Sequence, residues 1–266
     1  MAWIFRGLRD GVVTSRWPKR GDNYFDEFAA AVRVVDHRRE AVLPAAVEVA
    51  AGACPTEAIT VTPRLTLDRG RCILCGRCVA AAPEWFSWDT GSGNAALSHS
   101  ALVVGDVEEN EQALTELKTS LAHRVQRLRR SVHLRHIDTG SDGSDEWEIQ
   151  ALTNPVYDLH RLGIFFTASP RHADILLVTG IGATGMVEPL RRTLDAMPTP
   201  TVVVAVGTDA ISGGLIGRGY TGGVGVSEVV PVDVWVPGAP ASPFSVLHGI
   251  LLALGRVPLR RPGSAR

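Results

Sequence analysis

The four cysteines of this chain lie close together in the sequence, and their spacing is typical of metal chemistry. Three form a Cys-x-x-Cys-x-x-Cys run at Cys72, Cys75 and Cys78, and the fourth, Cys54, is followed directly by a proline. Bacterial ferredoxins bind cubane clusters with this arrangement, in which the cysteine before a proline ligates the cluster of the other run. The spacing therefore predicts that these four thiolates bind one 4Fe-4S cluster.

A second cluster of the ferredoxin kind is not expected. By the same spacing its cysteines would fall at Pro44, Val47, Ala50 and Ala82, and none of these positions holds a thiol. The absent ligands all belong to one cluster, and the ligands that are present all belong to the other. We therefore expect about four irons per chain rather than about eight.

Zinc, disulfides and free thiols fit this spacing less well. A single zinc ion takes ligands at tetrahedral corners, so a third cysteine directly after a Cys-x-x-Cys pair suits a cubane better, and zinc stays open as the lesser alternative. Disulfides need an oxidising compartment, and no apolar segment typical of a signal peptide follows Met1. Buried free cysteines do not account for the spacing of all four.

The composition of the chain excludes several classes of protein. Its 266 residues are 45% hydrophobic and 21% charged, an ordinary globular balance. A net charge of −1 gives no field that would attract nucleic acid. No apolar stretch approaches the roughly 20 residues of a spanning helix. We therefore expect a cytoplasmic chain with no nucleic-acid partner and no direct membrane span.

Sequence patterning divides the chain into two expected domains and a connecting helix. Residues 1–100 are rich in turn formers and short apolar runs and are expected to form a small α+β ferredoxin-like domain. Residues 101–131 include a run of leucines three and four positions apart, which predicts a connecting helix docked on the second domain. Residues 132–266 alternate β-branched runs with helix-like segments.

The second domain is expected to have an α/β fold built on a parallel sheet. Continuous apolar strands separated by helices are typical of a sheet that is covered on both faces. Ligands in such sheets sit at the carboxyl ends of the strands. The expected strands are 132–137, 175–179, 202–206 and 230–236, and the expected helices are 151–162, 186–197 and 243–254.

The first half of the chain resembles a known ferredoxin-type subunit. The segments that carry the resemblance are GVVTSRWP (11–18), CPTEAI (54–59) and CILCGRC (72–78). They look like the polyferredoxin subunit of membrane-bound nickel-iron hydrogenases, such as formate hydrogenlyase, and its complex I relative. The resemblance implies the same ligand set that the spacing predicts.

The second half resembles another subunit of the same complexes, the hydrogenase small subunit or 20 kDa subunit of NADH:ubiquinone oxidoreductase. The matching segments are NPVYDLHRLGI (154–164), ASPRHADILLVTG (168–180), VVAVG (203–207) and PVDVWVPGAPASP (231–243). The chain therefore looks like a fusion of two subunits. The resemblance implies a flavodoxin-like fold for residues 132–266.

That small subunit holds a cluster which exchanges electrons with the active site of the large subunit. Its four cysteine positions match Asp142, Asp145, Asp209 and Ala239, none of which is a thiol. The resemblance therefore implies that this second cluster is lost. The three aspartates admit two further interpretations, a site for Mg²⁺ or Ca²⁺ and ordinary capping or turn residues. We favour the second, because loops shaped for a cubane have no reason to suit such an ion.

Four other residues near these positions carry expectations of their own. Glu148 matches a family glutamate beside the cluster, so it suits either proton movement or an exposed surface role. His172 is expected to cap or pack rather than to bind a metal. Trp147 and Trp235, with Val236 to Pro240, are expected to form an exposed docking surface, because aromatic residues are typical of interface cores.

The resemblance implies an electron-transfer subunit of a membrane-associated hydrogenase or complex I-like oxidoreductase. Its expected partners are a large subunit and, through the complex, membrane subunits, which would place it peripherally on the cytoplasmic face of the membrane. No catalytic residue is assigned. The alternative is a structural scaffold subunit with no through-going electron transfer, since the second domain lacks its cluster ligands.

Overall fold

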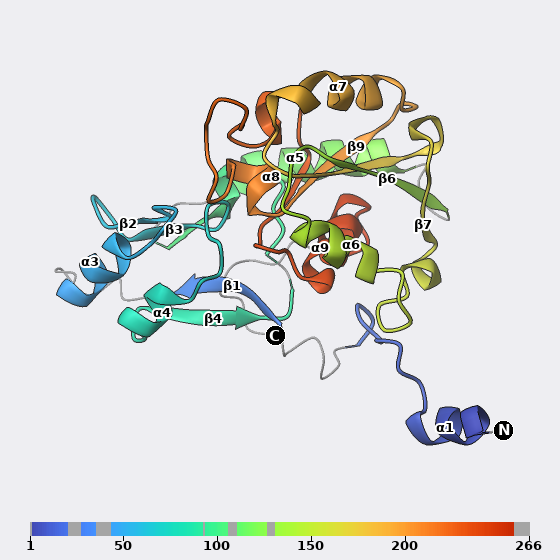
Figure 1. The fold of residues 1–266 in the computed structure, drawn as a ribbon, viewed down its shortest axis with the longest axis horizontal. Coiled ribbons are helices and arrows are strands. Elements are labelled where there is room, and N and C mark those ends of the chain that lie inside the picture. Colours follow the sequence, from blue (N-terminus) through green and yellow to red (C-terminus); the bar gives the residue numbers. More distant parts are fainter. Residues whose placement is uncertain are drawn as a thin grey trace.

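The computed structural model describes residues 2–20, 28–35, 44–92, 94–105, 111–126 and 131–257. Among these residues it contains a five-stranded parallel sheet and two small antiparallel sheets. Figure 1 shows the parallel sheet among helices, with the small sheets beside it. In spatial order the parallel strands are β10 (Val234–Val236), β9 (Val202–Val206), β8 (Ile175–Thr179), β6 (Val132–Asp138) and β7 (Ile164–Phe166).

Helices cover both faces of the parallel sheet. Every residue of β8 and β9 is buried, as expected for central parallel strands. One face packs against α5 (Glu111–Val125), α6 (Ser144–Ala151) and α9 (Pro243–Ala253). The other face packs against α7 (Val187–Asp195) and α8 (Thr208–Ser212). The expected α/β fold class is confirmed.

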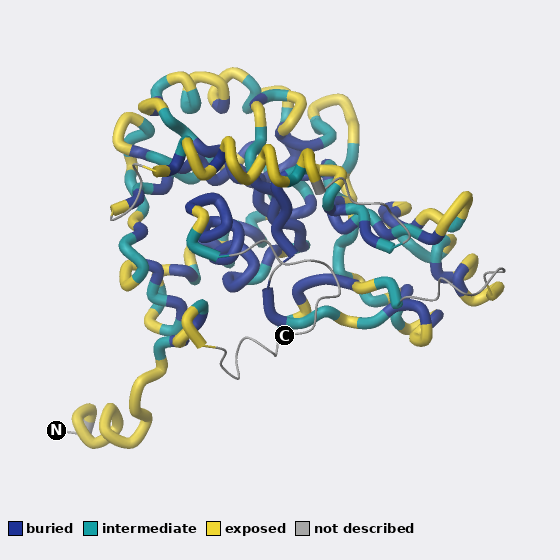
Figure 2. The backbone as a smooth tube through the Cα atoms, turned by 180° about the vertical axis from the view of Figure 1, so that it is seen from behind, coloured by how far each residue is buried: buried dark blue, intermediate teal, exposed yellow. Residues whose placement is uncertain are grey.

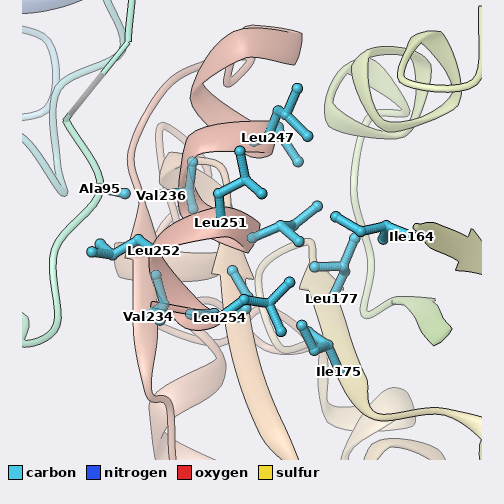
Figure 3. Packing of buried hydrophobic residues seen from close by; sticks show 14 of the residues in the cluster. Ala95, Ile164, Ile175, Leu177, Val234, Val236, Leu247, Leu251, Leu252 and Leu254 are labelled. Carbon is cyan, nitrogen blue, oxygen red and sulfur yellow. The ribbon is translucent and has the colours of Figure 1, made fainter. Parts of the chain in front are cut away.

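Helix α9 is buried along its whole length. The hydroxyl of Ser242 caps its N-terminus by accepting a hydrogen bond from the backbone N–H of Ser245 at 3.2 Å. Pro243 takes the first helical position, where the missing N–H leaves no bond unmade. Figure 3 shows Leu247 and Leu251 of this helix packed among side chains of the parallel sheet. The helix is therefore an interior layer.

The chain before the parallel sheet forms a small α+β region. Strand β1 (Ala29–Val34) pairs antiparallel with β4 (Phe86–Thr90), and β3 (Thr66–Asp68) pairs with β2 (Ile59–Thr60) and with β5 (Val103–Gly105). Strand β5 joins this sheet although it lies beyond residue 100. One buried cluster unites the strands with two helices, α3 (Ala45–Gly52) and α4 (Arg77–Ala81).

Two expected elements are wrong or shortened. The helix expected at 151–162 does not form, because the side chain of Asn154 accepts hydrogen bonds from the backbone N–H groups of Val156 and Tyr157 and makes a turn. A short 3₁₀ helix, Leu159–Leu162, follows. The strand expected at 230–236 begins only at Val234, and the three-residue strand β7 was not expected.

Helix α5 corresponds to the expected connecting helix. Leu121 and Val125 are buried in the cluster that includes the parallel sheet, with Leu114 partly buried beside them, whereas Leu117 is exposed. Figure 2 shows the exposed outer side of this helix. Two parts of the expected segment, 106–110 and 127–130, lie outside the described residues.

Helix α1 (Ala2–Asp10) projects from the body of the protein, as Figures 1 and 2 show. Its Trp3, Phe5 and Leu8 side chains are exposed, Trp3 to 77%. Exposed apolar groups gathered in this way are typical of a surface that contacts another molecule. None of the helices in the described part of the chain combines the length and apolar character that crossing a bilayer requires.

Candidate iron-sulfur site and the second cluster position

The structure brings the four cysteines around one cavity. Cys54 follows helix α3, Cys72 and Cys75 lie in the loop between β3 and α4, and Cys78 lies in α4. Residues of three strands, including Val32, Ile59 and Leu67, complete the lining. The walls are thus thiol and largely apolar, although the thiols come from segments separated by β2 and β3. Four thiol donors around one cavity are the ligand set of a cubane cluster.

The backbone near the cysteines includes two left-handed residues and an N–H group that donates to a sulfur. Leu74 and Gly76 take left-handed conformations, with φ of 54° and 72°. A side chain at Gly76 would crowd the ring of Trp88, whose nearest atom would lie 3.0 Å from a Cβ there. The N–H of Ala58 donates to the Sγ of Cys54 at 3.3 Å. N–H donors of this kind tune iron-sulfur clusters.

Burial disfavours the thiolate form of two of the four cysteines, Cys72 and Cys78. Burial raises the pKa of Cys72 to about 12, partly offset by a hydrogen bond from the backbone of Leu74. Burial also raises the pKa of Cys78. Because metal ligands must be thiolates, loading this site releases protons. Cys75 is the exposed member of the set.

The cysteine loop is attached directly to helix α8 of the parallel-sheet region. The hydroxyl of Thr208 donates a hydrogen bond to the carbonyl oxygen of Cys72 at 3.0 Å, and the hydroxyl of Ser212 donates to the carbonyl oxygen of Gly70 at 2.8 Å. A Cβ at Gly70 would lie 2.8 Å from Ile211, so the loop needs glycine to approach this closely. The two halves of the chain therefore meet at the candidate site.

The positions that match the lost cluster lie at the carboxyl ends of the parallel strands. Asp142 and Asp145 follow β6, Asp209 lies in α8 after β9, and Ala239 follows β10. The three aspartates interact electrostatically with one another. The structure therefore places the three aspartates near one another. The described residues include no group of three His, Cys, Asp or Glu side chains arranged to hold a single metal ion.

Asp145 joins two loops of this second position. Its side chain is only 4% exposed, and it accepts a hydrogen bond from the backbone N–H of Ala241 at 2.9 Å. Its other carboxylate oxygen packs against Gly207, where any side chain would overlap with it. Burial raises the pKa of Asp145 to about 8, and the nearby acids add to this. Asp145 thus connects the loops after β6 and β10 and touches the loop after β9.

The other two aspartates differ from Asp145 in their surroundings. Asp142 is exposed and accepts hydrogen bonds from the backbone N–H and the hydroxyl of Ser144, which lower its pKa. Burial raises the pKa of Asp209, and Asp142 raises it further. Asp142 therefore acts as a turn residue.

Sequence reasoning missed a polar network beside this position. His136 lies with its Nε2 atom 3.0 Å from the hydroxyl of Thr179, and that hydroxyl donates to the carboxylate of Glu146. Ser141 donates to the same carboxylate at 2.8 Å. Burial lowers the pKa of His136. The sequence signal for this network was the position of His136 and Thr179 near the carboxyl ends of two strands, which the structure shows to be adjacent.

The expectation that Trp235 and Val236 belong to an exposed docking surface is wrong. Trp235 is only 6% exposed, because its backbone pairs with Ala96 and its ring packs against His99. Val236 is buried as well. Trp147 is 72% exposed and agrees with the expectation.

The remaining two expected positions differ in exposure. Glu148 is half-buried, and burial raises its pKa. His172 is exposed at the end of the 3₁₀ helix Pro170–His172.

Comparison with protein families gives two matches within the chain. Residues 143–253 match the family described as NADH ubiquinone oxidoreductase, 20 Kd subunit. Residues 65–127 match the family described as 4Fe-4S single cluster domain. The second match begins after Cys54 and so includes Cys72, Cys75 and Cys78 of the four cysteines.

Two curated relatives and one solved structure are similar to this chain. Formate hydrogenlyase subunit 7 of Escherichia coli is 35% identical over 58% of this chain, which spans 60% of that relative's length. A probable membrane-bound hydrogenase subunit, mbhJ of Pyrococcus furiosus, is 34% identical over 56% of this chain and 89% of its own length. A chain of the membrane-bound sulfane sulfur reductase, an archaeal respiratory membrane complex, is 28% identical with a TM-score of 0.44, covering 50% of this chain and 74% of that chain. The chain belongs to the family of the NADH ubiquinone oxidoreductase 20 kDa subunit and carries a 4Fe-4S single cluster domain in addition.

Proposed function

We propose that this chain is an electron-transfer subunit of a membrane-associated hydrogenase or complex I-like oxidoreductase. In this proposal Cys54, Cys72, Cys75 and Cys78 bind one 4Fe-4S cluster. The observation that carries it is the common cavity that these four cysteines line, with a backbone N–H directed at Cys54. The proposed division of the chain is an iron-sulfur domain (1–100), a connecting helix (101–131) and a 20 kDa subunit-like domain (132–266).

A 4Fe-4S cluster supplies one-electron transfer. The residues of this chain determine where and how the electron moves. Apolar lining residues such as Val32 and Leu67 keep water away from one side of the cavity. Cys75 is exposed, so its side is the edge at which a redox partner can approach. The carbonyl oxygen of Cys72 is hydrogen-bonded to Thr208, which connects this cysteine to the parallel-sheet domain.

The second domain has a structural role in this proposal. Thiolates hold a cubane, and none stands at Asp142, Asp145, Asp209 or Ala239. Asp145 instead links two of the three loops by its hydrogen bond to Ala241. This contact favours a scaffold role for residues 132–266, and it is also the observation that supports the alternative, a scaffold subunit without electron transfer.

The proposed partners are the large subunit of such a complex and, through it, membrane subunits. The relatives support this, because they are named as subunits of a formate hydrogenlyase and of a membrane-bound hydrogenase. The exposed apolar side chains of α1 and the exposed Trp147 provide contact surface for a partner. Attachment through partners would place the chain peripherally on the cytoplasmic face of the membrane.

An anaerobic reductive titration tests electron transfer directly. The purified chain should take up about one electron and pass it on to an added oxidised viologen dye. Cys72→Ser should abolish this uptake, whereas the exposed change Thr60→Ser should leave it unchanged. Absence of reversible uptake in the wild-type chain would contradict the proposal and favour the scaffold alternative.

A further inference from the structure

A buried arginine lies beside the candidate cluster and is not explained by the ligand set. Arg69 directly follows β3, and its side chain is only 4% exposed. Its Nε donates to the carbonyl oxygen of Val32 at 3.2 Å, and its Nη2 lies 3.5 Å from a carboxylate oxygen of Asp89. The carbonyl oxygen of Arg69 accepts a hydrogen bond from the backbone N–H of Cys72 at 3.3 Å. Arg69 therefore belongs to the same turn as a cluster cysteine.

Among the residues that the structure describes, the carboxylate that pairs with Arg69 is that of Asp89. A buried charge is costly unless it is paired and hydrogen-bonded. Asp89 is more than a third exposed, and its 3.5 Å contact is at the long limit of a hydrogen bond. Burial lowers the pKa of Arg69, while Asp89 and then Cys72 raise it, and Arg33 lowers it. Val32, whose carbonyl oxygen accepts from Arg69, lines the cavity of the four cysteines, so the guanidinium lies next to a wall of the candidate site.

We propose that Arg69 raises the reduction potential of the cluster bound by the four cysteines. This inference rests on the proposed function. Reduction adds one negative charge to a thiolate-ligated cluster, and a cation held in a poorly polarisable interior stabilises that added charge. Arg69 touches no substrate, so it acts as a positioning residue that sets the potential rather than as a catalytic residue.

A purely structural role for Arg69 makes a different prediction. Arg69 also ties strand β1, through Val32, to strand β4, through Asp89. Loss of such a tie would lower stability or cluster loading but would have no fixed direction on the potential. The charge of Arg69 and the charge of Asp89, by contrast, must act on the cluster in opposite directions.

The test is a redox titration of the whole chain, with the cluster signal followed by electron paramagnetic resonance and the iron content measured first. Arg69→Gln should shift the midpoint to more negative potential, and Arg69→Lys should stay nearer to the wild type. Asp89→Asn should shift the midpoint to more positive potential, because it leaves the cation less neutralised. Arg33→Gln is the matched control: it removes an exposed arginine, and solvent screens its effect.

Unchanged midpoints in fully loaded Arg69→Gln and Asp89→Asn would overturn the inference, as would shifts in the same direction. If Arg69→Gln fails to bind iron, Asp89→Asn decides, since an unchanged or more negative midpoint in that variant contradicts the proposal. A wild-type chain that binds no cluster would refute the proposed function itself. A cluster that is present but insensitive to these charges would refute only the role of Arg69.

Discussion

The hydroxyl of Thr208 donates a hydrogen bond to the carbonyl oxygen of Cys72 at 3.0 Å. Thr208 is the first residue of helix α8 and lies next to Asp209, one of the positions that match a lost cluster ligand. The contact therefore joins the candidate iron-sulfur loop to the second cluster position within one chain. Separate subunits would need a protein–protein interface to make such a contact.

Removing this hydrogen bond should weaken the connection between the two halves. Thr208→Val keeps the shape of the buried side chain but leaves the carbonyl of Cys72 without its donor. Such a change costs about 1–3 kcal/mol of unfolding free energy, measurable by urea denaturation. Thr153→Val, which removes an exposed hydroxyl bonded within its own turn, should change stability by less than about 0.5 kcal/mol. Equal effects of the two changes would show that the Thr208 contact carries no stability.

The buried carboxyl of Asp145 predicts a pH-dependent difference between the wild type and Asp145→Asn. Its pKa is raised to about 8 in the folded state, above the roughly 3.9 of an unfolded aspartate. The folded chain therefore holds the proton more strongly, and the stability from this group is present below about pH 4 and is lost as the pH rises through about 8. Asparagine keeps an oxygen acceptor for the N–H of Ala241 and does not titrate.

Asp145→Asn should therefore gain stability relative to the wild type as the pH rises from about 5 to about 8. Unfolding free energies of both proteins at the two pH values measure the difference, and effects of pH on the rest of the chain cancel. Asp142→Asn is the matched control, because the pKa of the exposed Asp142 is lowered rather than raised. A constant difference between Asp145→Asn and the wild type would contradict the burial of this carboxyl.

Much of the parallel sheet could be predicted from the sequence, because its central strands are buried on both faces. The bounds of β8 and β9 were expected correctly, since each is a continuous apolar run. The helix at 151–162 was wrong because the side chain of Asn154 competes for the backbone N–H groups of the following residues. Trp235 was misplaced because its strand is covered by Ala96 and His99, which lie far away in the sequence.

The candidate site was predictable only in part. Spacing alone identified the four cysteines as a ligand set, because a cubane takes three cysteines at three-residue intervals and a fourth that precedes a proline. Arg69 could not be found in this way, because its burial depends on Val32 and Asp89, which come from two other strands. The same holds for the contact of His136 with Thr179. The ligand set and the domain boundaries stay predictions.

Restoring the lost thiols should bring back a second cluster. The combination of Asp142→Cys, Asp145→Cys, Asp209→Cys and Ala239→Cys supplies a full ligand set at grouped positions. After anaerobic reconstitution this variant should hold about eight irons per chain, whereas each single change should leave the iron at about four. Iron at the wild-type level in the fourfold variant would show that these loops no longer fit a cubane.

The apolar side chains of α1 should be needed for assembly but not for cluster binding. Replacing Trp3, Phe5 and Leu8 together by serine should reduce co-purification with the large subunit expressed alongside, because exposed aromatic anchors contribute strongly to interfaces. Iron content should not change. Replacing Leu215 and Ile216, which are exposed on a different segment, should leave co-purification intact. Full assembly of the α1 variant would place the contact surface elsewhere.

The metal content of the anaerobically purified wild-type chain shows directly whether the four cysteines bind one 4Fe-4S cluster. One cluster held by Cys54, Cys72, Cys75 and Cys78 predicts about four iron and about four sulfide per chain, with a broad visible absorbance and no zinc. Cys75→Ser should abolish or convert the cluster. About one zinc per chain without visible absorbance, or about eight irons in the wild type, would contradict a single 4Fe-4S cluster held by these cysteines.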